Sequence, residues 1–429
     1  MKIDEFLTKQ ITQVDDLLRQ KNRAKDYSTF HTTLPRLDLS ELLNYLCAEK
    51  IFYFKSKYED STFLALGRSK IVKSKDYEAF IQKNPKLYLI AAFLFEENAK
   101  QSEFILPEWL FRTSGENTEI IISAPEESEN FSSCNLFFNN LLDPFAHDPD
   151  ILSWSSYHEI PEHDQWITMI EECNQHFLKK ELEKIVLSRK KIFTYDTPLD
   201  AVAVFQTLLA KNNQAKSSYA IYYQKSFEEI FISLTPEKLF SIKASLFESI
   251  SLAASAPRGK TIKEDQYFEE MLTNNDKLIR EHELVTKEIF KRLSSLVENI
   301  EISPIQTMKL PYIQHRSAPI KGSLKPSTSL IDLVNSLHPT PAVGGLPWDK
   351  AKNKIIELEL VKRNHYAAPI GIVSSQYSEL AVGIRSALLE INTLTLFAGA
   401  GIVEGSNPEE EWLETATKMH PFLKVVNHE

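Results

Sequence analysis

Residues 396–418, close to the C-terminus, limit the possible folds more than any other segment of this sequence. A strand-like run ends in small residues, and a helix start follows, because Ser406 or Asn407 can cap a helix and Pro408 suits its first position. The segment therefore predicts a buried strand that turns sharply into a helix.

Three glycines in this segment, Gly399, Gly401 and Gly405, have a spacing like that of a dinucleotide-binding loop. That motif needs a helix, a return strand and an acidic residue roughly twenty positions further on. Only 30 residues follow Gly399, so we do not expect a nucleotide-binding unit here. We expect instead that the glycines let the backbone lie close to a ligand or to another strand.

One face of the predicted helix is charged. Glu411, Glu414 and Lys418 follow the spacing i, i+3, i+7 and share that face. Two carboxylates and an ammonium beside a glycine-rich turn suit a divalent cation and an anionic ligand. For this segment taken alone, a solvated acidic first turn that favours the helix dipole is the simpler interpretation.

The composition is that of a globular chain with one large domain or two ordinary ones, with 43% hydrophobic residues in 429. The net charge of −10 argues against nucleic acid or an anionic membrane as the main partner. An anionic substrate would need local Arg, Lys or a metal ion.

Three cysteines, Cys47, Cys134 and Cys173, are too far apart for a disulfide framework or a zinc site, and they fit a reducing cytoplasm. The start of the chain lacks the apolar core of a secretory signal. The longest apolar run, residues 87–95, is too short to span a bilayer, so a cytoplasmic protein is expected.

Helices and strands alternate irregularly along the sequence. Helices are predicted over residues 1–25, 165–180, 197–211, 264–297, 329–337 and 348–361. Strands are predicted within 51–106 and over 184–189, 219–224, 228–233, 238–243, 366–374, 379–389 and 393–399. The segments 124–163 and 302–328 are predicted as loops. This order predicts an α+β fold with large, mostly antiparallel sheets.

Two charged residues lie on elements that are otherwise apolar. Glu281 borders the apolar stripe of the predicted helix 264–297, which indicates a partner, either a base or a metal. Lys184 opens an apolar strand; it either holds its head group in water at the strand end or is partly buried with the lowered pKa that a general base needs. The position in the sequence alone favours a Lys184 head group in water.

Other candidates lie in turns and small-residue segments. Glu237 lies in a Thr-Pro-Glu-Lys turn, where a solvated carboxylate is the default. The run that contains Ala254 and Ser255 is small enough to bring backbone donors to a ligand. His338 lies in a rigid Pro/Gly-rich turn, although a lone histidine is more often structural. Arg385, among small residues of the predicted strand 379–389, indicates a buried carboxylate partner from a ligand or an internal acid.

Taken together, these segments resemble the chorismate-utilising enzymes, and most closely isochorismate synthase. The matching pieces occur in the family's order: residues 184–189, 235–239, 252–259, 277–285, 338–347, 366–374, 383–387 and 396–418. The resemblance implies the fold of anthranilate synthase component I, with two large, mostly antiparallel sheets and helices outside. Residues 161–429 would form the chorismate-binding catalytic region, and residues 1–160 the variable N-terminal part of the same fold.

The resemblance also implies a magnesium site. Glu281 and Glu414 would be Mg²⁺ ligands, with Glu411 in support through water. Arg385 and Lys418 would hold the enolpyruvyl carboxylate of chorismate with the backbone around Gly399. Further substrate contacts are expected at Ala254, Ser255 and His338.

Two positions distinguish the activities within the resembled family. Members that use water as the nucleophile carry lysine at the position of Lys184, whereas members that use an amine carry glutamine. Aminodeoxychorismate synthases carry a nucleophilic lysine where this chain has Ala253. The resemblance therefore implies a water user, in which Lys184 takes a proton from water that attacks C2, and Glu237 protonates the hydroxyl that leaves C4.

The implied product is isochorismate, which would feed menaquinone, siderophore or salicylate formation. The alternatives are a salicylate synthase, which adds loss of pyruvate, and a non-catalytic chorismate-binding protein. A monomer without a glutamine amidotransferase subunit is expected. The chain departs from the family pattern at Ser233 or Leu234 and at Ala254, where glycine is usual, and at Leu278, where an acidic residue is common.

Overall fold

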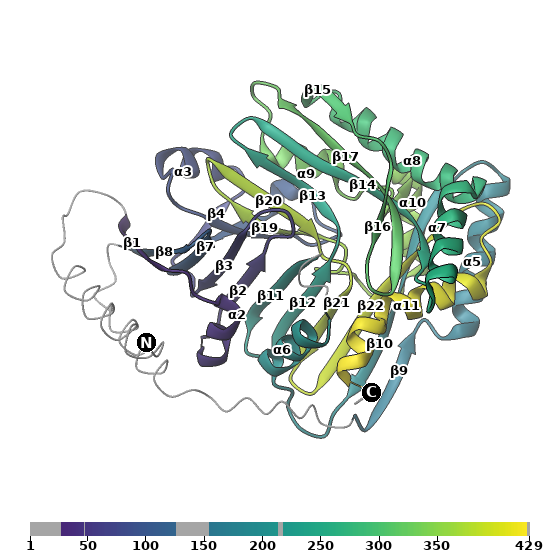
Figure 1. Ribbon diagram of the computed structural model, residues 1–429, viewed down its shortest axis with the longest axis horizontal. Coiled ribbons are helices and arrows are strands. Elements are labelled where there is room, and N and C mark those ends of the chain that lie inside the picture. The colour runs from purple at the N-terminus through teal and green to yellow at the C-terminus, as the bar shows by residue number, and fades with distance from the viewer. Residues whose placement is uncertain (1–26, 47, 126–153, 213–217, 427–429) are drawn as a thin grey trace.

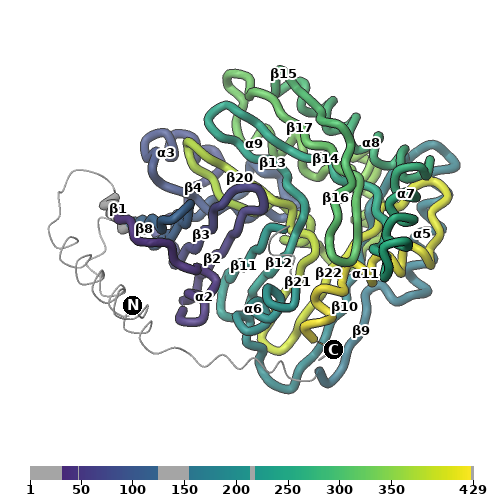
Figure 2. The backbone as a smooth tube through the Cα atoms, viewed as in Figure 1, coloured from purple at the N-terminus to yellow at the C-terminus, as the bar shows by residue number. Residues whose placement is uncertain are grey.

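Two antiparallel sheets packed on one another, with helices outside, form the fold of the computed structural model (Figures 1 and 2). The structure describes residues 27–46, 48–125, 154–212 and 218–426, so the helix predicted over residues 1–25 lies outside the described part. The predicted α+β class is confirmed.

The described strands form two sheets. The first sheet has the order β1 (Tyr27–Pro35), β8 (Asn117–Pro125), β7 (Trp109–Ser114), β3 (Ser61–Leu66), β2 (Ile51–Lys55), β11 (Tyr219–Ser226), β12 (Glu229–Thr235), β21 (Ser386–Glu390), β22 (Thr393–Ile402), β10 (Lys184–Thr194) and β18 (Gly345–Leu346), with β9 (Ser156–Ile160) beside β10. The second has the order β15 (Val297–Ile302), β17 (Ile313–Leu324), β14 (Leu246–Pro257), β13 (Lys238–Lys243), β20 (Tyr377–Val382), β19 (Pro369–Val373), β5 (Leu89–Ala92), β6 (Glu103–Leu106) and β4 (Lys70–Lys73), with β16 (Gln306–Lys309) beside β17.

The helices lie on the outside of the sheets (Figure 1). They are α2 (Leu39–Leu42), α3 (Tyr77–Lys83), α5 (His163–Leu178), α6 (Ala201–Lys211), α7 (Ile262–Asn274), α8 (Asp276–Leu293), α9 (Leu330–Leu337), α10 (Trp348–Leu358) and α11 (Pro408–Val426). Helices α7 and α8 pack on β14, and α11 packs on β22. No described helix combines the length and the apolar character that a membrane span requires.

Strands from both ends of the chain share the two sheets. Strand β2 pairs with β11 in the first sheet, and β5 pairs with β19 in the second. The described N-terminal strands therefore extend the sheets that the later strands form, as Figure 1 shows for purple β2 beside teal β11.

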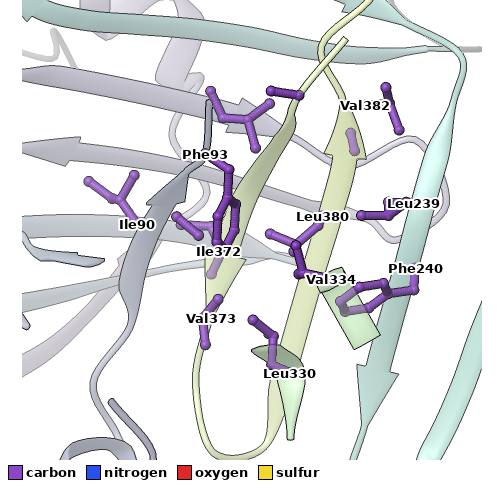
Figure 3. Packing of buried hydrophobic residues seen from close by; sticks show 14 of the residues in the cluster. Ile90, Phe93, Leu239, Phe240, Leu330, Val334, Ile372, Val373, Leu380 and Val382 are labelled. Atoms are coloured by element: carbon purple, nitrogen blue, oxygen red, sulfur yellow. The ribbon is translucent and has the colours of Figure 1, made fainter. Parts of the chain in front are cut away.

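The largest apolar cluster extends along the second sheet, and it carries one wall of the site described below. Figure 3 shows Ile372 and Leu380 of this sheet near Val334 of α9. Each such large side chain contributes roughly 1.5–3 kcal/mol when fully buried. The same cluster includes Tyr366 and Phe397, so a rigid core holds these two rings in place.

The structure corrects the predicted helix over 264–297, which is two helices. Helix α7 ends at Asn274, and the side chain of Asn275 accepts hydrogen bonds from the backbone of Lys277 and Leu278 to start α8. The apolar spacing continues across this break, so periodicity alone did not reveal it. The new helix start turns Lys277 and Glu281 toward the same cavity.

Two predicted loops contain strands. Segment 302–328 holds β16 and the twelve-residue β17, and segment 124–163 ends in β9. Strand β17 was not predicted because it buries polar side chains, among them His315 and Arg316. Its sequence therefore lacks the alternation of apolar and polar residues that indicates a strand.

The predicted strand 379–389 is also interrupted. It is two strands, β20 and β21, which belong to different sheets. Arg385 lies in the turn between them with φ +50°, not on a strand. This sheet-to-sheet crossing places the arginine where the two sheets meet.

Candidate active site

A cavity between the two sheets and the helices α8 and α11 gathers most of the predicted site residues. Its charged and polar lining comes from distant parts of the sequence: Lys184, Glu237, Ser255, Lys277, Glu281, His315, Tyr366, Arg385, Glu411, Glu414 and Lys418. Ala254 and Gly399 also line it. Of the site residues predicted from the sequence, only His338 is absent from the described lining.

Lys184 is buried in this cavity, with 1% of its surface exposed, so the interpretation that its head group lies in water is wrong. Its Nζ lies 2.7 Å from Oε1 of Glu281 on α8. Gly401 makes room for this pair, because a Cβ at that position would lie 3.0 Å from Cε of Lys184 and 3.1 Å from Oε1 of Glu281. The glycine run of β22 thus permits a buried ion pair across the cavity.

Glu237, between β12 and β13, is also buried, although a solvated turn carboxylate was the default. Burial raises the pKa of this carboxyl to about 7, against the opposing effect of Lys184, Lys418 and Arg385. A carboxyl group with a pKa near neutrality is suited to donate a proton. The cavity therefore holds a buried lysine and a carboxylic acid, the two group types that acid–base chemistry requires.

Glu411 and Glu414 face the cavity from α11, as their spacing predicted. Burial and the charge of Glu414 raise the pKa of Glu411 to about 7. Burial acts to raise the pKa of Glu414 as well, but the ion pair with Lys418 and a hydrogen bond from Ser255 outweigh it, so that this pKa is lowered. The simpler interpretation of the helix, a solvated acidic first turn, does not hold for these two residues.

Each acidic side chain of the proposed magnesium site lies near an ammonium. Glu281 is 2.7 Å from Lys184, Glu414 is 2.6 Å from Lys418, and Glu411 is 3.6 Å from Lys277. Among the described residues no three His, Cys, Asp or Glu side chains converge closely enough to hold a metal ion.

The donor chemistry of these three carboxylates nevertheless fits Mg²⁺, which prefers hard oxygen ligands. Their mutual repulsion contributes to the raised pKa of Glu411, since the charges of Glu414 and Glu281 both act on it. A bound divalent cation would relieve that repulsion.

Arg385 projects into the cavity from its turn and is buried. Burial lowers the pKa of its guanidinium to about 10. The structure describes no carboxylate within ion-pair distance of it; its nearest described side-chain partner is His315, with Nη2 at 3.4 Å from Nε2. A buried guanidinium without an internal acid favours the alternative in which a ligand supplies the carboxylate.

Lys418 and Gly399 meet at the same wall. The ammonium of Lys418 donates to the carbonyl of Gly399 at 2.9 Å. A Cβ on Gly399 would lie 2.8 Å from the hydroxyl of Tyr366, so this glycine is needed for the tyrosine to reach the cavity.

Ala254 lies at a bulge in β14, opposite β17, with φ +64°. A left-handed alanine is strained, which explains why glycine is usual at this position in the resembled family. The bulge places Ser255 on the cavity, where its Oγ lies 3.2 Å from Nδ1 of His315.

His338 lies outside the cavity lining. It is half-buried, with both ring nitrogens shielded from solvent and its ring edge-on to Phe95 at 5.5 Å between centroids, and burial lowers its pKa to about 3. The Pro/Gly-rich turn does reach the cavity, through Ala342 and Val343. The expected contact from this turn is therefore apolar, and a direct role for the imidazole has no support from its position.

Three lining residues, His315, Tyr366 and Lys277, received no role from the sequence. His315 lies in the segment predicted as a loop, whereas Tyr366 and Lys277 are the first residues of segments that carry the resemblance. For Lys277, its position four residues before Glu281 was a usable signal, since i and i+4 share a helix face.

Comparison with known proteins agrees with this geometry. The profile of a family described as "Chorismate binding enzyme" matches residues 84–427. Isochorismate synthase MenF of Haemophilus influenzae is 28% identical over 421 residues, which cover 97% of this chain and 95% of that protein. Isochorismate synthase MenF of Bacillus subtilis is 36% identical over 268 residues, which cover 62% of this chain and 56% of that relative.

A solved structure has the same fold. The structure of MenF, the menaquinone-specific isochorismate synthase of Escherichia coli, superposes with a TM-score of 0.90 at 26% identity, covering 98% of this chain and all of that chain. The matched region contains the residues that line the cavity. The chain belongs to the chorismate binding enzyme family, and within it is similar to the isochorismate synthases, which are isomerases.

Proposed function

We propose that this protein is an isochorismate synthase that converts chorismate to isochorismate in the presence of Mg²⁺. The observation that carries the proposal is the placement of buried Lys184 and buried Glu237 on one cavity with an arginine that has no described acidic partner. The similarity to enzymes named isochorismate synthases supports the same activity.

The proposed reaction exchanges a hydroxyl group across the ring. Water forms a bond to C2 while the ring double bonds shift and the C4–oxygen bond breaks. Lys184 accepts the proton of the attacking water, and Glu237 gives its proton to the departing hydroxyl, which leaves as water. The substrate gains one water and loses one, so the product is an isomer.

Lys184 must be a neutral amine to accept this proton. Its contact with Glu281 holds Nζ at the cavity wall, 2.7 Å from Oε1 of that carboxylate. We propose that Glu281 and Glu414 hold Mg²⁺ directly and Glu411 through water. When bound, the ion would supply positive charge for the ring carboxylate of chorismate.

The second carboxylate of chorismate, on its enolpyruvyl group, is assigned to Arg385 and Lys418. A guanidinium takes a carboxylate through two parallel hydrogen bonds, whereas an ammonium offers a point charge. These cations supply locally the positive charge that the chain, at −10 overall, lacks. Because water is the nucleophile, no ammonia-delivering amidotransferase subunit is required, and we propose that the chain acts without one.

The test is to incubate the protein with chorismate and Mg²⁺, identify the products, and repeat the reaction after chelation of the metal. Isochorismate, formed with Mg²⁺ and not with the chelator, is the expected result. Salicylate with pyruvate would replace the proposal with a salicylate synthase. Intact chorismate in the presence of the metal would identify a binding protein without this activity, and unchanged turnover after complete metal removal would refute the magnesium assignment.

A further inference from the structure

A second cavity lies on the face of the first sheet that also carries the active site. Alternate residues of a strand share a face, so Lys190 of β10 lies on the same side as Lys184. On the neighbouring strand β22, Thr395 of the second cavity likewise lies on the side of Gly399.

The two cavities are separated by a pair of rings. Tyr366 and Phe397 line both cavities and stack with 5.2 Å between centroids at an interplanar angle of 13°. On the far side of this wall, Phe231 and His365 add two further aromatic rings to the lining of the second cavity. The site therefore offers flat apolar surfaces to a ring-shaped ligand.

Lys190 brings a buried cation to this aromatic cavity, with 8% of its surface exposed. Its Nζ donates to the carbonyl of Lys362 at 2.9 Å and lies 5.2 Å from the centroid of the Phe397 ring. The structure describes no carboxylate within 4 Å of this ammonium. An ammonium has three donors, and burial with a single described acceptor is unfavourable unless a ligand provides another.

The acidic residues that line the second cavity do not pair with the ammonium of Lys190. Glu229 is held by Lys225 at 2.9 Å, and Glu390 is exposed at the end of β21. The guanidinium of Arg363, which also lines the cavity, is engaged by Glu359. Lys190 is thus the one buried charge of the described lining that no opposite charge in contact neutralises.

We propose that this second cavity binds a small cyclic monocarboxylate, with its carboxylate on the ammonium of Lys190 and its ring against Phe397 and Phe231. The single uncompensated cation suits one carboxylate, in contrast to the active site, where Arg385, Lys418 and the three acidic residues suit a dicarboxylate with a metal ion. The proposal does not depend on the reaction catalysed at the active site.

Benzoate is the probe, with binding to the full chain measured by titration calorimetry. The wild type and Arg385→Lys should bind benzoate equally, because Arg385 belongs to the other cavity. Lys190→Gln should weaken binding about tenfold or more, the effect of losing a charged hydrogen bond, whereas Lys190→Arg should retain most of it. Equal affinity of Lys190→Gln and the wild type, or a loss confined to Arg385→Lys, would overturn the proposal.

A second measurement uses only the wild type, so it does not depend on the folding of any variant. Crystals of the wild type soaked with 4-bromobenzoate should show anomalous bromine signal in the second cavity, with the carboxylate within hydrogen-bond distance of Nζ of Lys190. Signal only beside Arg385, or none at either position, would contradict the proposal.

Discussion

Two ion pairs contact strand β10 and differ in how completely their hydrogen bonds are satisfied: Arg363 and Glu359 bond to its backbone, and Lys184, its first residue, pairs with Glu281 of α8. Arg363 donates from Nε to Oε2 of Glu359 at 2.8 Å, and its two terminal nitrogens reach the carbonyls of Val343 and Val186. Glu359 also accepts from the backbone nitrogen of Ser188 at 2.7 Å.

The other pair, Lys184 and Glu281, is joined by a single described contact at 2.7 Å. Both of its members line the active-site cavity, whereas the first pair lies outside that cavity, with 1% and 6% of its two side chains exposed. The comparison shows two uses of a buried ion pair. A pair whose donors and acceptors all have protein partners (a saturated pair) stabilises the fold, whereas a pair with spare donors and acceptors (an unsaturated pair) can bind a ligand. A mutation in the Lys184–Glu281 pair should therefore mainly lower turnover, whereas a mutation in the Arg363–Glu359 pair should mainly lower the free energy of unfolding.

The largest expected effect is on turnover in Lys184→Ala. Loss of a general base typically costs 10²–10⁴-fold in rate, and we expect kcat to fall by about that factor. Water can enter the cavity beside Glu281, so the free energy of unfolding should change less than in Arg363→Ala. Steady-state kinetics and urea unfolding of both variants measure this; turnover like that of the wild type would remove Lys184 from the mechanism.

Arg363→Ala should break the scaffold pair. Removing one partner of a buried ion pair typically lowers the free energy of unfolding by roughly 3–5 kcal/mol, because it leaves Glu359 with an unpaired charge. Urea denaturation measures this, and Glu359→Gln in the same background should recover part of the loss by removing that charge. A stability within about 1 kcal/mol of the wild type would show that the saturated pair is not structural.

Arg385→Lys should weaken the capture of chorismate by roughly 1.5–3 kcal/mol, or about ten- to a hundredfold in kcat/KM, because lysine cannot bind a carboxylate through two parallel hydrogen bonds. Lys418→Ala is expected to act similarly. If Arg385 is instead purely structural, Arg385→Lys will lower the melting temperature while kcat/KM of the folded enzyme stays unchanged, and the carboxylate assignment must be dropped.

The pH dependence of stability isolates Glu237. Its pKa is about 7 in the fold against 4.5 for the ordinary carboxyl, so between these values the folded chain holds a proton that the unfolded chain releases. Stability should therefore fall as pH rises from about 4.5 to 7, by an amount absent from Glu237→Gln. Parallel melting curves for the two proteins across that range would contradict the raised pKa.

The sequence predicted the fold class, and ten of the eleven residues proposed for the site line one cavity, but their environments were predicted only in part. Spacing on one helix placed Glu411, Glu414 and Lys418 together correctly, because i, i+3 and i+7 fix a face regardless of the rest of the chain. Burial of Lys184 and Glu237 depends on strands from elsewhere in the chain. Their local positions therefore predicted, wrongly, that both charged groups are exposed to solvent.

Each difference between the predicted and the observed structure has its own physical cause. Strand β17, which carries His315, buries polar side chains toward the cavity and so lacks an apolar alternation. Arg385 owes its place to a crossing between sheets that its neighbours' small size did not reveal. His338 was grouped with the site because its turn reaches the cavity, but the core holds its ring elsewhere.

The most direct test of the central claim, that the unsaturated pair performs chemistry on water, is the reaction of chorismate in water enriched in ¹⁸O with Mg²⁺ present. The account predicts isochorismate with one ¹⁸O atom, located in the C2 hydroxyl, from the wild type and from the folded fraction of Arg363→Lys. Lys184→Ala should form it at least about a hundredfold more slowly. Isochorismate without ¹⁸O at C2, or labelled product formed by Lys184→Ala at the wild-type rate, would contradict it.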